Sequence, residues 1–488
     1  MALRRDDWLD LARKVDWTYR YVTEQDMFPE ALSGTPWLTH DDAWADWSEV
    51  YRTSYREYVQ NQSAKDRSVL AVRDALSKAR IHDRLDPAWL QLVKFHQGAF
   101  ALGEYMAMQA ELRMCRFGRD SAWRIMANLG ALDEMRHTQI PLLLGHDLLE
   151  MDDHFDWTHK AYHTNNFIMI AARHLFEDGF LAANAIEIAI QLNFVFETGF
   201  TNLQFMALAA MADRADHQLF ETALASIQTD EARHAQLGHP VVRALIHHGG
   251  REYTQHLLDK MWWRSWRIFL ATTGTAMEYL TPVAARTRSF KEFMEEWVIH
   301  HFMRNLEEFD FDLPWFWDLF VDELDYAHHS LQLALYSYRP MLWFDEPAPS
   351  EPERDWLREK YPAWAETYQP NWDRIEDAWE QQGWAGSVAY TLPALCNLCQ
   401  LPTVFVHPGK NTACSLKRNG RSYLFCSQPC RWVFEQQPER FSEHRTVVDR
   451  VFAGEAPSDL LALLGWMGHD TPENRGKDLR RRGLEPVL

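Results

Sequence analysis

One charged pentapeptide occurs twice in this chain, as DEMRH at residues 133–137 and as DEARH at residues 230–234. Both copies lie in long segments whose apolar residues recur at helical spacing and which contain few prolines. Carboxylates in such apolar helices are costly to bury unless something compensates their charge. The repeat therefore predicts helices that pack around a shared polar centre, and a bound cation would supply the compensation.

Each copy contains a Glu-x-x-His pair, whose two side chains share one face of a helix. The helix before each pair carries a glutamate among apolar neighbours, in AFALGEYMAM and in NFVFETGF. The predicted ligands are Glu104, Glu134, His137, Glu197, Glu231 and His234. Four carboxylates and two imidazoles from four helices form the ligand set of a ferritin-like dinuclear site, and they suit iron or manganese. A single Glu-x-x-His would be typical of a solvated surface pair, but the repetition favours metal binding.

Breakers and composition divide the chain into four regions. We expect an N-terminal arm with short helices over residues 1–85 and a ferritin-like diiron helical core over 86–340. A linker with helices follows over 341–385, and a small C-terminal domain occupies 386–488. The predicted fold class is all-α, a ferritin-like four-helix bundle with extra helices and a small cysteine-rich α+β module at the C-terminus.

The charge of the chain restricts its partners. Fifty Lys and Arg against 70 Asp and Glu give a net charge of −20, which argues against binding to nucleic acid. The N-terminal residues have no apolar core typical of a secretory signal, and no apolar run reaches the ~18 residues of a membrane span. We therefore expect a cytoplasmic protein without a membrane span.

Four cysteines near the C-terminus have the spacing of a structural zinc site. The pairs are Cys396-x2-Cys399 and Cys426-x3-Cys430. Free buried thiols are the competing interpretation. The remaining two cysteines, Cys115 and Cys414, have no assigned role.

Residues near the predicted iron ligands suggest further roles. Thr201 and Gln228 lie at helical spacing from Glu197 and Glu231, so both should face the metal side. The Thr201 hydroxyl could hydrogen-bond a bound oxygen species, or it could instead bond back to its own helix. A layer that orients the histidines is predicted at Asp133, Arg136, Asp230 and Arg233, with surface ion pairing as the alternative.

Apolar side chains on two helix faces could line a dry cavity for a small hydrocarbon. They are Phe100, Gly103 and Ala107 around Glu104, and Leu192, Phe196 and Phe205 around Glu197. Such stripes are also typical of ordinary helix cores, although a glycine beside a ligand leaves room for a substrate.

Several segments carry a resemblance to a known family. In their order and spacing, GEYMA, DEMRH, FETGFTNLQF and SIQTDEARHAQ resemble the large hydroxylase subunit of bacterial multicomponent diiron monooxygenases. The similarity is closest to the toluene, alkene and isoprene monooxygenase branch. RDDWLDLAR, SFKEFMEEW, DLPWFWDLF, KYPAWAETY and VVDRVFAGE extend it over nearly the whole chain.

The resemblance implies roles for individual residues. The six predicted ligands match the iron ligands of the family, Thr201 matches its active-site threonine, and Asn202 with Gln228 matches polar residues that respond to an effector protein. Phe176 joins the six cavity residues as pocket lining. Phe100 departs from the smaller aliphatic side chains that are familiar at its position, so the size of the substrate is not carried over.

The resemblance also implies an activity and partners. Two irons would activate O2 and insert one oxygen atom into an arene or alkene, with electrons from NADH supplied through a flavin and iron–sulfur reductase, a Rieske-type ferredoxin, or both. The hydroxylase would contain smaller subunits in a dimer of heterotrimers and would bind a cofactorless effector protein. A desaturase-like or radical-generating diiron protein and a ferritin-like iron store share the ligand spacing and remain the alternatives.

Overall fold

The computed structural model describes residues 44, 47–48, 51–149, 151, 167–181, 184–337, 343–382, 394–403, 406–407 and 409–468. Most of the predicted N-terminal arm before residue 51, and the C-terminal residues 469–488, lie outside the described residues.

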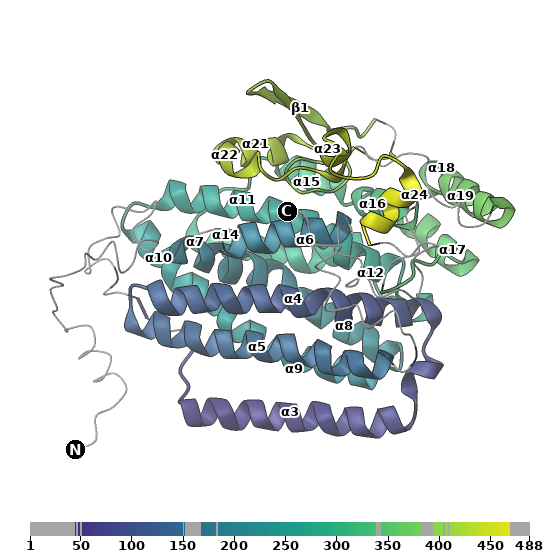
Figure 1. Cartoon of the computed structure of the whole chain (residues 1–488). Helices are drawn as coiled ribbons and strands as arrows, with labels where there is room; N and C mark the ends of the chain where they lie inside the picture. Colours follow the sequence, from purple (N-terminus) through teal and green to yellow (C-terminus); the bar gives the residue numbers. More distant parts are fainter. Residues whose placement is uncertain are drawn as a thin grey trace, which may run out of the picture.

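Four long helical runs form the centre of the molecule. They are α4 (Pro87–Phe117), α5 (Ser121–Leu149), the continuous run of α7 (Ala185–Ile188), η6 (Ala189–Thr201) and α8 (Asn202–Arg214), and α9 (Gln218–His234). α4 packs against α5 in one half of the repeat, and α8 packs against α9 in the other (Figure 1). The two halves meet where α5 packs against α9 and α4 against η6. The Asp86 carboxylate starts α4 by accepting hydrogen bonds from the backbone of Ala88 and Trp89 at 2.9 and 3.3 Å.

The segment η6 is a π-helix where the sequence predicts an α-helix. Its 13 residues are all buried, so the segment has no polar stripe from which the helical period could be determined. The Thr198 hydroxyl donates to the carbonyl oxygen of Asn193, five residues earlier, at 2.7 Å. The wider turn is a local departure that often accompanies functional sites.

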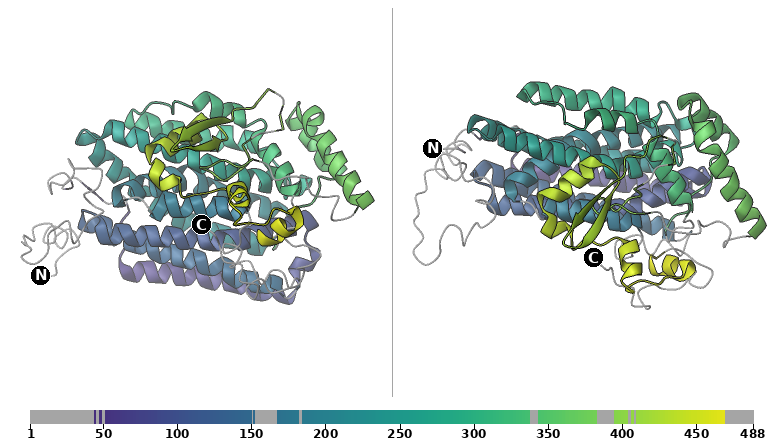
Figure 2. Two further views of the ribbon diagram at one scale, coloured as in Figure 1. Left: turned by 45° about the horizontal axis from the view of Figure 1, so that its top comes forward. Right: turned by 90° about the horizontal axis from the view of Figure 1, so that it is seen from above.

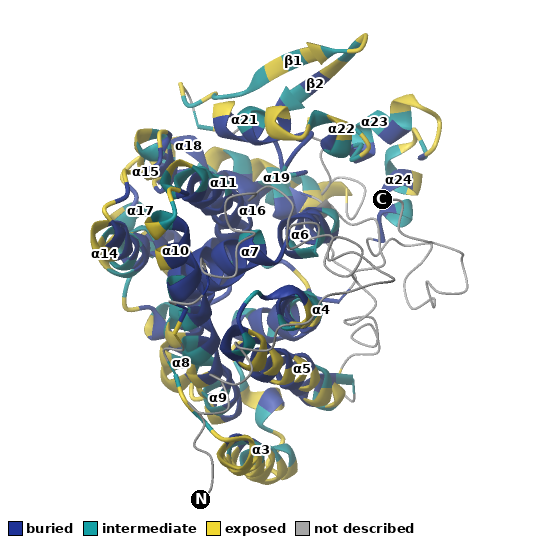
Figure 3. Ribbon diagram, turned by 90° about the vertical axis from the view of Figure 1, so that its left-hand side faces the viewer, coloured by how far each residue is buried: buried dark blue, intermediate teal, exposed yellow. Residues whose placement is uncertain are grey.

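Residues 55–78 differ from the predicted arm of short helices, because they form the 24-residue helix α3 (Tyr55–Lys78). Ser54 and Glu57 start it with reciprocal side-chain to backbone hydrogen bonds. α3 lies along the outside of the bundle against α9, with most of its surface exposed (Figures 1 and 3). Only Tyr58, Gln62 and Val69 are buried, and this low apolar content explains why the sequence pattern did not indicate a long helix.

Further helices cover the bundle, and in the described part of the chain none is long and apolar enough to cross a membrane. Their bounds are η3 (Ile81–Arg84), α6 (Phe167–Phe176), η5 (Glu177–Leu181), η7 (Ala235–Leu237), α10 (Gly238–His247), α11 (Arg251–Phe269), η8 (Leu270–Gly274), α12 (Thr275–Glu278), η9 (Val283–Ala285), α13 (Phe290–Phe293), η10 (Met294–Ile299), α14 (His300–Phe309), α15 (Trp317–Glu323), α16 (Ala327–Ser337), α17 (Glu351–Lys360), α18 (Trp364–Thr367) and α19 (Gln369–Gln382). Among them, α11 packs directly against η6.

The C-terminal module is a β-hairpin with short helices. Strands β1 (Cys414–Arg418) and β2 (Arg421–Phe425) pair antiparallel, with Cys414 opposite Phe425. Asn419 and Gly420 form the turn, and both have the positive φ that tight hairpins require. The helices are α21 (Gln428–Gln436), α22 (Pro438–Phe441), α23 (Val447–Phe452) and α24 (Leu460–Trp466). The module lies on one face of the helical layers (Figure 2).

α10 approaches η6 closely at Gly238, and a substitution there tests this packing. A Cβ at this position would lie 2.6 Å from Phe194 Cβ and 2.7 Å from Phe194 N, and backbone cannot move aside. We expect Gly238→Ala to lower the free energy of unfolding by about 1–3 kcal/mol, measured by chemical denaturation. Gly179→Ala is the control, since its Cβ would meet only Met261 at 3.8 Å. Equal stability of the two variants would contradict the close packing of η6.

Candidate metal centre

The structure brings the six predicted ligands together in the middle of the bundle, one set from each of the four helical runs. All six are buried, with Glu104 the most exposed at 9%. Glu134, His137, Glu231 and His234 form one cluster whose possible ligand atoms lie within 4.8 Å of one another. Glu197 and His234 belong to a second, overlapping cluster. Glu104 is in neither cluster, but its carboxyl contacts the carboxyl of Glu134, and both residues line one apolar cavity.

The two histidines define two adjacent positions. His137 Nδ1 lies 3.0 Å from Glu231 Oε1 and 3.5 Å from Glu134 Oε2. His234 Nδ1 lies 3.0 Å from Glu197 Oε1 and 3.3 Å from Glu134 Oε1. Glu134 thus turns one oxygen toward each histidine. A carboxylate placed in this way fits a pair of metal ions better than a single ion.

Several of these atoms have no hydrogen bond of normal geometry. They are both carboxylate oxygens of Glu134, Oε1 of Glu231, Nδ1 of His137 and Nε2 of His234. Buried polar atoms rarely remain unpaired in folded proteins unless something else binds them. The four carboxylates and two imidazoles that converge here match the donor set that iron prefers in dinuclear sites. The residues present therefore fit a diiron centre.

The electrostatics of the metal-free side chains point the same way. Burial, reinforced by the charge of Glu231, raises the pKa of Glu104 to about 7. Burial and the charges of Glu231 and Glu104 raise the pKa of Glu134 well above its usual value. Burial alone would lower the pKa of His137, but Asp230 and Glu231 outweigh it and raise the value to about 9. Carboxylates this close repel one another, and divalent cations would relieve that repulsion.

The predicted orienting residues form a buried network rather than surface ion pairs. Asp230 Oδ2 lies 3.4 Å from His137 Nε2 and accepts a hydrogen bond from Arg136 at 2.9 Å. Arg233 pairs with both Asp133 and Asp230. Because Asp230 faces Nε2 of His137, it leaves Nδ1 of that ring directed at the ligand cluster.

Helix α3 completes this network. Its contribution was not predicted from the sequence. Gln62 Nε2 donates to Asp133 at 2.6 Å and to Asp230 at 2.8 Å, so one amide joins the two halves of the repeat. Tyr58 donates to Asp133 at 2.8 Å, and Lys65 lies 2.5 Å from Asp230. These residues sit in a helix with little apolar character, and no sequence signal connects them to the centre.

Glu111 is a second feature that the sequence analysis missed. It is fully buried in α4, and it shares a cluster with Glu197 and His234. The Asn193 amide donates to Glu111 Oε1 and to Glu197 Oε2, both at 2.8 Å, and so holds the Glu197 oxygen that faces away from His234. Glu111 lies seven residues after Glu104 and so on the same helix face. This spacing is the sequence feature that could have predicted its position near the centre.

An apolar cavity adjoins the cluster. Its walls include Glu104, Glu134, Glu197, Glu231 and Thr201. The structure places all seven predicted pocket residues on its lining: Phe100, Gly103, Ala107, Phe176, Leu192, Phe196 and Phe205. Sequence analysis missed a further wall that α6, η5, α11 and η8 contribute: Ile168, Met169, Ala172, Phe180, Ile268, Phe269 and Thr272. The centre therefore faces a space suited to a small apolar molecule.

The three polar residues predicted to be catalytic occupy different places. Thr201 lines the cavity, and its hydroxyl also donates a long hydrogen bond of 3.4 Å to the carbonyl oxygen of Phe196. Gln228 donates to Asn202 at 2.8 Å, and this partly exposed pair does not line the cavity. Thr201 is thus beside the centre, whereas the pair joins α8 to α9.

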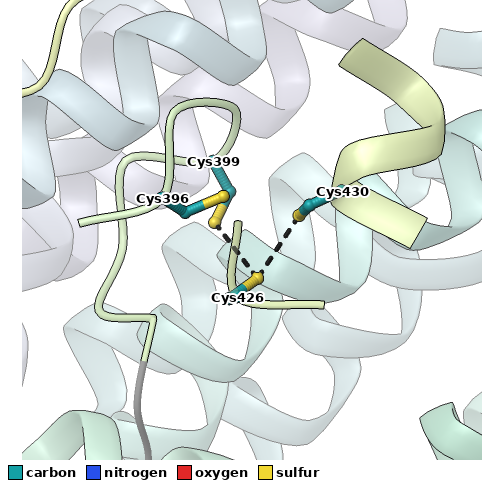
Figure 4. Close-up of side chains that lie close together, drawn as sticks. All are labelled: Cys396, Cys399, Cys426 and Cys430. Atoms are coloured by element: carbon teal, nitrogen blue, oxygen red, sulfur yellow. Dashed lines mark hydrogen bonds between the residues drawn. The ribbon is translucent and has the colours of Figure 1, made fainter. Parts of the chain in front are cut away.

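Cys396, Cys399, Cys426 and Cys430 come together in the C-terminal module, with their sulfurs directed toward one another (Figure 4). All are free thiols, separated by 3.9 Å between Cys399 and Cys426 and by 3.4 Å between Cys426 and Cys430. Four sulfurs around a tetrahedral zinc ion at about 2.3 Å lie roughly 3.8 Å apart. The arrangement therefore fits a four-thiolate zinc site.

Comparisons with known proteins agree with this geometry. A sequence model of the Methane/Phenol/Alkene Hydroxylase family matches residues 17–249. Over 485 residues, the chain is 41% identical to the oxygenase component subunit alpha of the alkene monooxygenase system of Xanthobacter autotrophicus strain Py2. That alignment covers 98% of this chain and 96% of the relative. The chain belongs to the methane/phenol/alkene hydroxylase family.

Two further relatives have lower sequence identity to this chain. The oxygenase component of phenol 2-monooxygenase from Pseudomonas sp. strain CF600 is 27% identical over 467 residues, covering 92% of this chain and 87% of that protein. The X-ray structure of phenol hydroxylase from Pseudomonas sp. OX1 matches 96% of this chain and 94% of its own, with a TM-score of 0.82 at 24% identity. This match confirms the predicted helical diiron hydroxylase fold. The alkene and phenol relatives are named as oxygenase components of larger systems.

Gln62 offers a test of the network around the histidines. We expect Gln62→Ala to lower the free energy of unfolding by about 2 kcal/mol, because two buried carboxylates lose a donor. Chemical denaturation measures the change. Gln60→Ala, on an exposed turn of the same helix, is the control and should have little effect. If the two variants are equally stable, the bridge between the aspartates contributes nothing.

Proposed function

We propose that this chain is the catalytic hydroxylase subunit of a multicomponent monooxygenase that oxidises a small hydrocarbon with O2. One observation carries the proposal: two Glu-x-x-His pairs, each with buried atoms that lack a hydrogen-bond partner, converge with two further glutamates beside an apolar cavity. The sequence relation to alkene and phenol monooxygenase components supports an alkene or an arene as the substrate class.

In this proposal Glu104, Glu134, His137, Glu197, Glu231 and His234 would hold two irons, one beside His137 and the other beside His234. When bound, the irons supply the activation of O2 and the electrons for transfer of one oxygen atom to the substrate. Glu134 has the position of a ligand shared between the two sites. Asp230 and Arg136 hold His137 in the ring orientation that the centre needs.

Other residues of the chain prepare the site for substrate. The phenylalanines of the cavity exclude water, which favours binding of a hydrocarbon and protects the chemistry from side reactions. The Thr201 hydroxyl is only weakly held by its own helix, so it can donate to or accept from a group bound at the centre. Asn202 and Gln228 form a contact between α8 and α9 that an effector protein can alter.

The proposal includes partner proteins. Smaller hydroxylase subunits would complete a dimer of heterotrimers, and an effector protein would bind to it. Electrons from NADH would arrive through a flavin and iron–sulfur reductase, a Rieske-type ferredoxin, or both. The relatives named as components of larger systems support this organisation. The setting would be the cytoplasm, where thiols such as those of the C-terminal cluster stay reduced.

Metal analysis tests the diiron centre. After anaerobic Fe(II) reconstitution of the hydroxylase with its partner subunits, mass spectrometry should find about two irons per chain. Glu134→Ala and Glu231→Ala should lose most of this iron, whereas Glu221→Ala, elsewhere on α9, should retain it. Wild-type protein that binds no iron under these conditions would contradict the proposal.

Oxidation assays separate the candidate activities. With NADH, reductase and effector added, the iron-loaded protein should convert toluene or a short alkene to a hydroxylated or epoxidised product. Mineral accumulation far beyond two irons would indicate a ferritin-like store, and dehydrogenation of an acyl substrate would indicate a desaturase. Either result, without oxygen insertion, would overturn the assignment as a monooxygenase.

We also propose that the four cysteines bind a structural zinc ion, and the convergence of their sulfurs supports this. Cys426→Ser and Cys430→Ser should each lose about one zinc per chain and lower the melting temperature by several degrees. Cys414→Ser, at a half-buried position on β1, serves as the control. Unchanged zinc content and melting temperature in the first two variants would mean that the thiols are free.

A further inference from the structure

A second, smaller cavity lies between the cysteine cluster and the bundle. Its walls come from α6, α11, the loop around Cys399 and Cys430 of α21. Ile268 lines both this cavity and the large apolar cavity. Ile268 of α11 therefore lies at the boundary between the space beside the cysteines and the space beside the metal centre.

The cysteine module is fastened to α11 close to this side chain. The Trp263 indole donates to Cys430 Sγ at 3.1 Å, and both residues are fully buried. Arg267 is buried beside the sulfurs and forms a 2.8 Å ion pair with Glu323. Burial opposes the charge of this guanidinium, but Cys426 and Glu323 outweigh it and raise the pKa of Arg267. The next residues along α11, Ile268 and Phe269, line the large cavity.

The cysteine module also contacts η5, which forms another part of the wall of the large cavity that was not predicted from the sequence. Arg440 of α22 pairs with the Asp178 carboxylate and donates to the Asp178 carbonyl oxygen at 2.7 Å. Arg264 of α11 pairs with the other carboxylate oxygen. Burial opposes ionisation of Asp178, yet Arg264, His174 and Arg440 lower its pKa to about 2, so it is charged at neutral pH. Arg440 of the module and Arg264 of α11 therefore both form ion pairs with the buried carboxylate of Asp178.

Asp178 lies between two aromatic side chains of the large cavity. Phe176 and Phe180 precede and follow it by two residues, and both line that cavity. Their rings lie 5.9 and 5.3 Å from the ring of Phe196, which comes from η6 beside Glu197. A shift of η5 would therefore move the Phe180 ring directly, and Phe176 at the adjoining end of α6 with it.

We propose that the cysteine module positions the far wall of the substrate cavity, through the contact of Arg440 with η5 and that of Cys430 with α11, and so sets which hydrocarbons fit and how they are oriented. Asp178, Trp263 and Arg440 are positioning residues, since they act through Phe176, Phe180 and Ile268. This inference rests on the proposed function, because it takes the large cavity to be the substrate site.

The test compares Arg440→Gln with Arg418→Gln in the assembled hydroxylase. Arg418 of β1 forms an ion pair with Glu439, which lies on α22 next to Arg440. This ion pair is on the exposed surface of the module. The measurements are the regioisomer distribution from toluene and the ratio of kcat/KM for a short alkene to that for toluene. We expect Arg440→Gln to change the ratio or the distribution at least about threefold, because small changes in a pocket wall shift selectivity. Arg418→Gln should match wild type.

A readout independent of activity is hydrogen exchange of the backbone. Exchange in residues 176–181 and 263–269 should be faster in Arg440→Gln than in wild type or Arg418→Gln. Arg440→Lys, which keeps the charge, should restore part of both effects. If Arg440→Gln does not fold, Trp263→Phe carries the test, since it removes the contact with Cys430 but keeps an aromatic ring.

The outcomes are distinct. Wild-type selectivity and exchange in Arg440→Gln and in Trp263→Phe would overturn the inference. An equal loss of activity toward all substrates, with unchanged product distribution, would also overturn it and indicate only a stabilising role. Failure of the wild-type enzyme to oxidise any hydrocarbon would instead refute the proposed function.

Discussion

The burial of four glutamates at the centre of one helical bundle is the constraint on which the rest of the structure depends. Their mutual repulsion and desolvation would destabilise a fold that held no compensating charge. The chain compensates in two layers: converging imidazoles and carboxylates that suit two cations, and outside them aspartates paired with arginines. The contacts of its glutamate at this centre therefore help to fix the position of each helical run in the bundle.

The ligand set and the fold class were predictable because helical spacing determines which residues share a face. Glu134 with His137, and Glu231 with His234, needed no more than that rule. The same rule, applied to Glu111, would have found one more buried carboxyl. It could not reveal the π-helical winding of η6, because thirteen buried residues in succession give no polar side from which to read a period.

Contacts between distant segments were beyond the sequence pattern. Gln62 bridges two aspartates that lie far along the chain, and nothing in its own neighbourhood marks it. The wall formed by η5 and α11 depends on how the cysteine module docks, which requires the positions of Arg440 and Cys430 relative to the bundle. Such features follow from tertiary packing and not from local periodicity.

The docking of α3 has a consequence for how the chain opens. This helix buries only Tyr58, Gln62 and Val69, and it is held by polar contacts with Asp133, Arg136, Asp147 and Asp230. Water can replace such contacts more readily than it can replace apolar packing, so α3 should detach at a lower free energy than the four central helices. Transient detachment of α3 would then expose the outer side of the histidine network while the bundle stays folded, and would give small ions a route that avoids the apolar cavity.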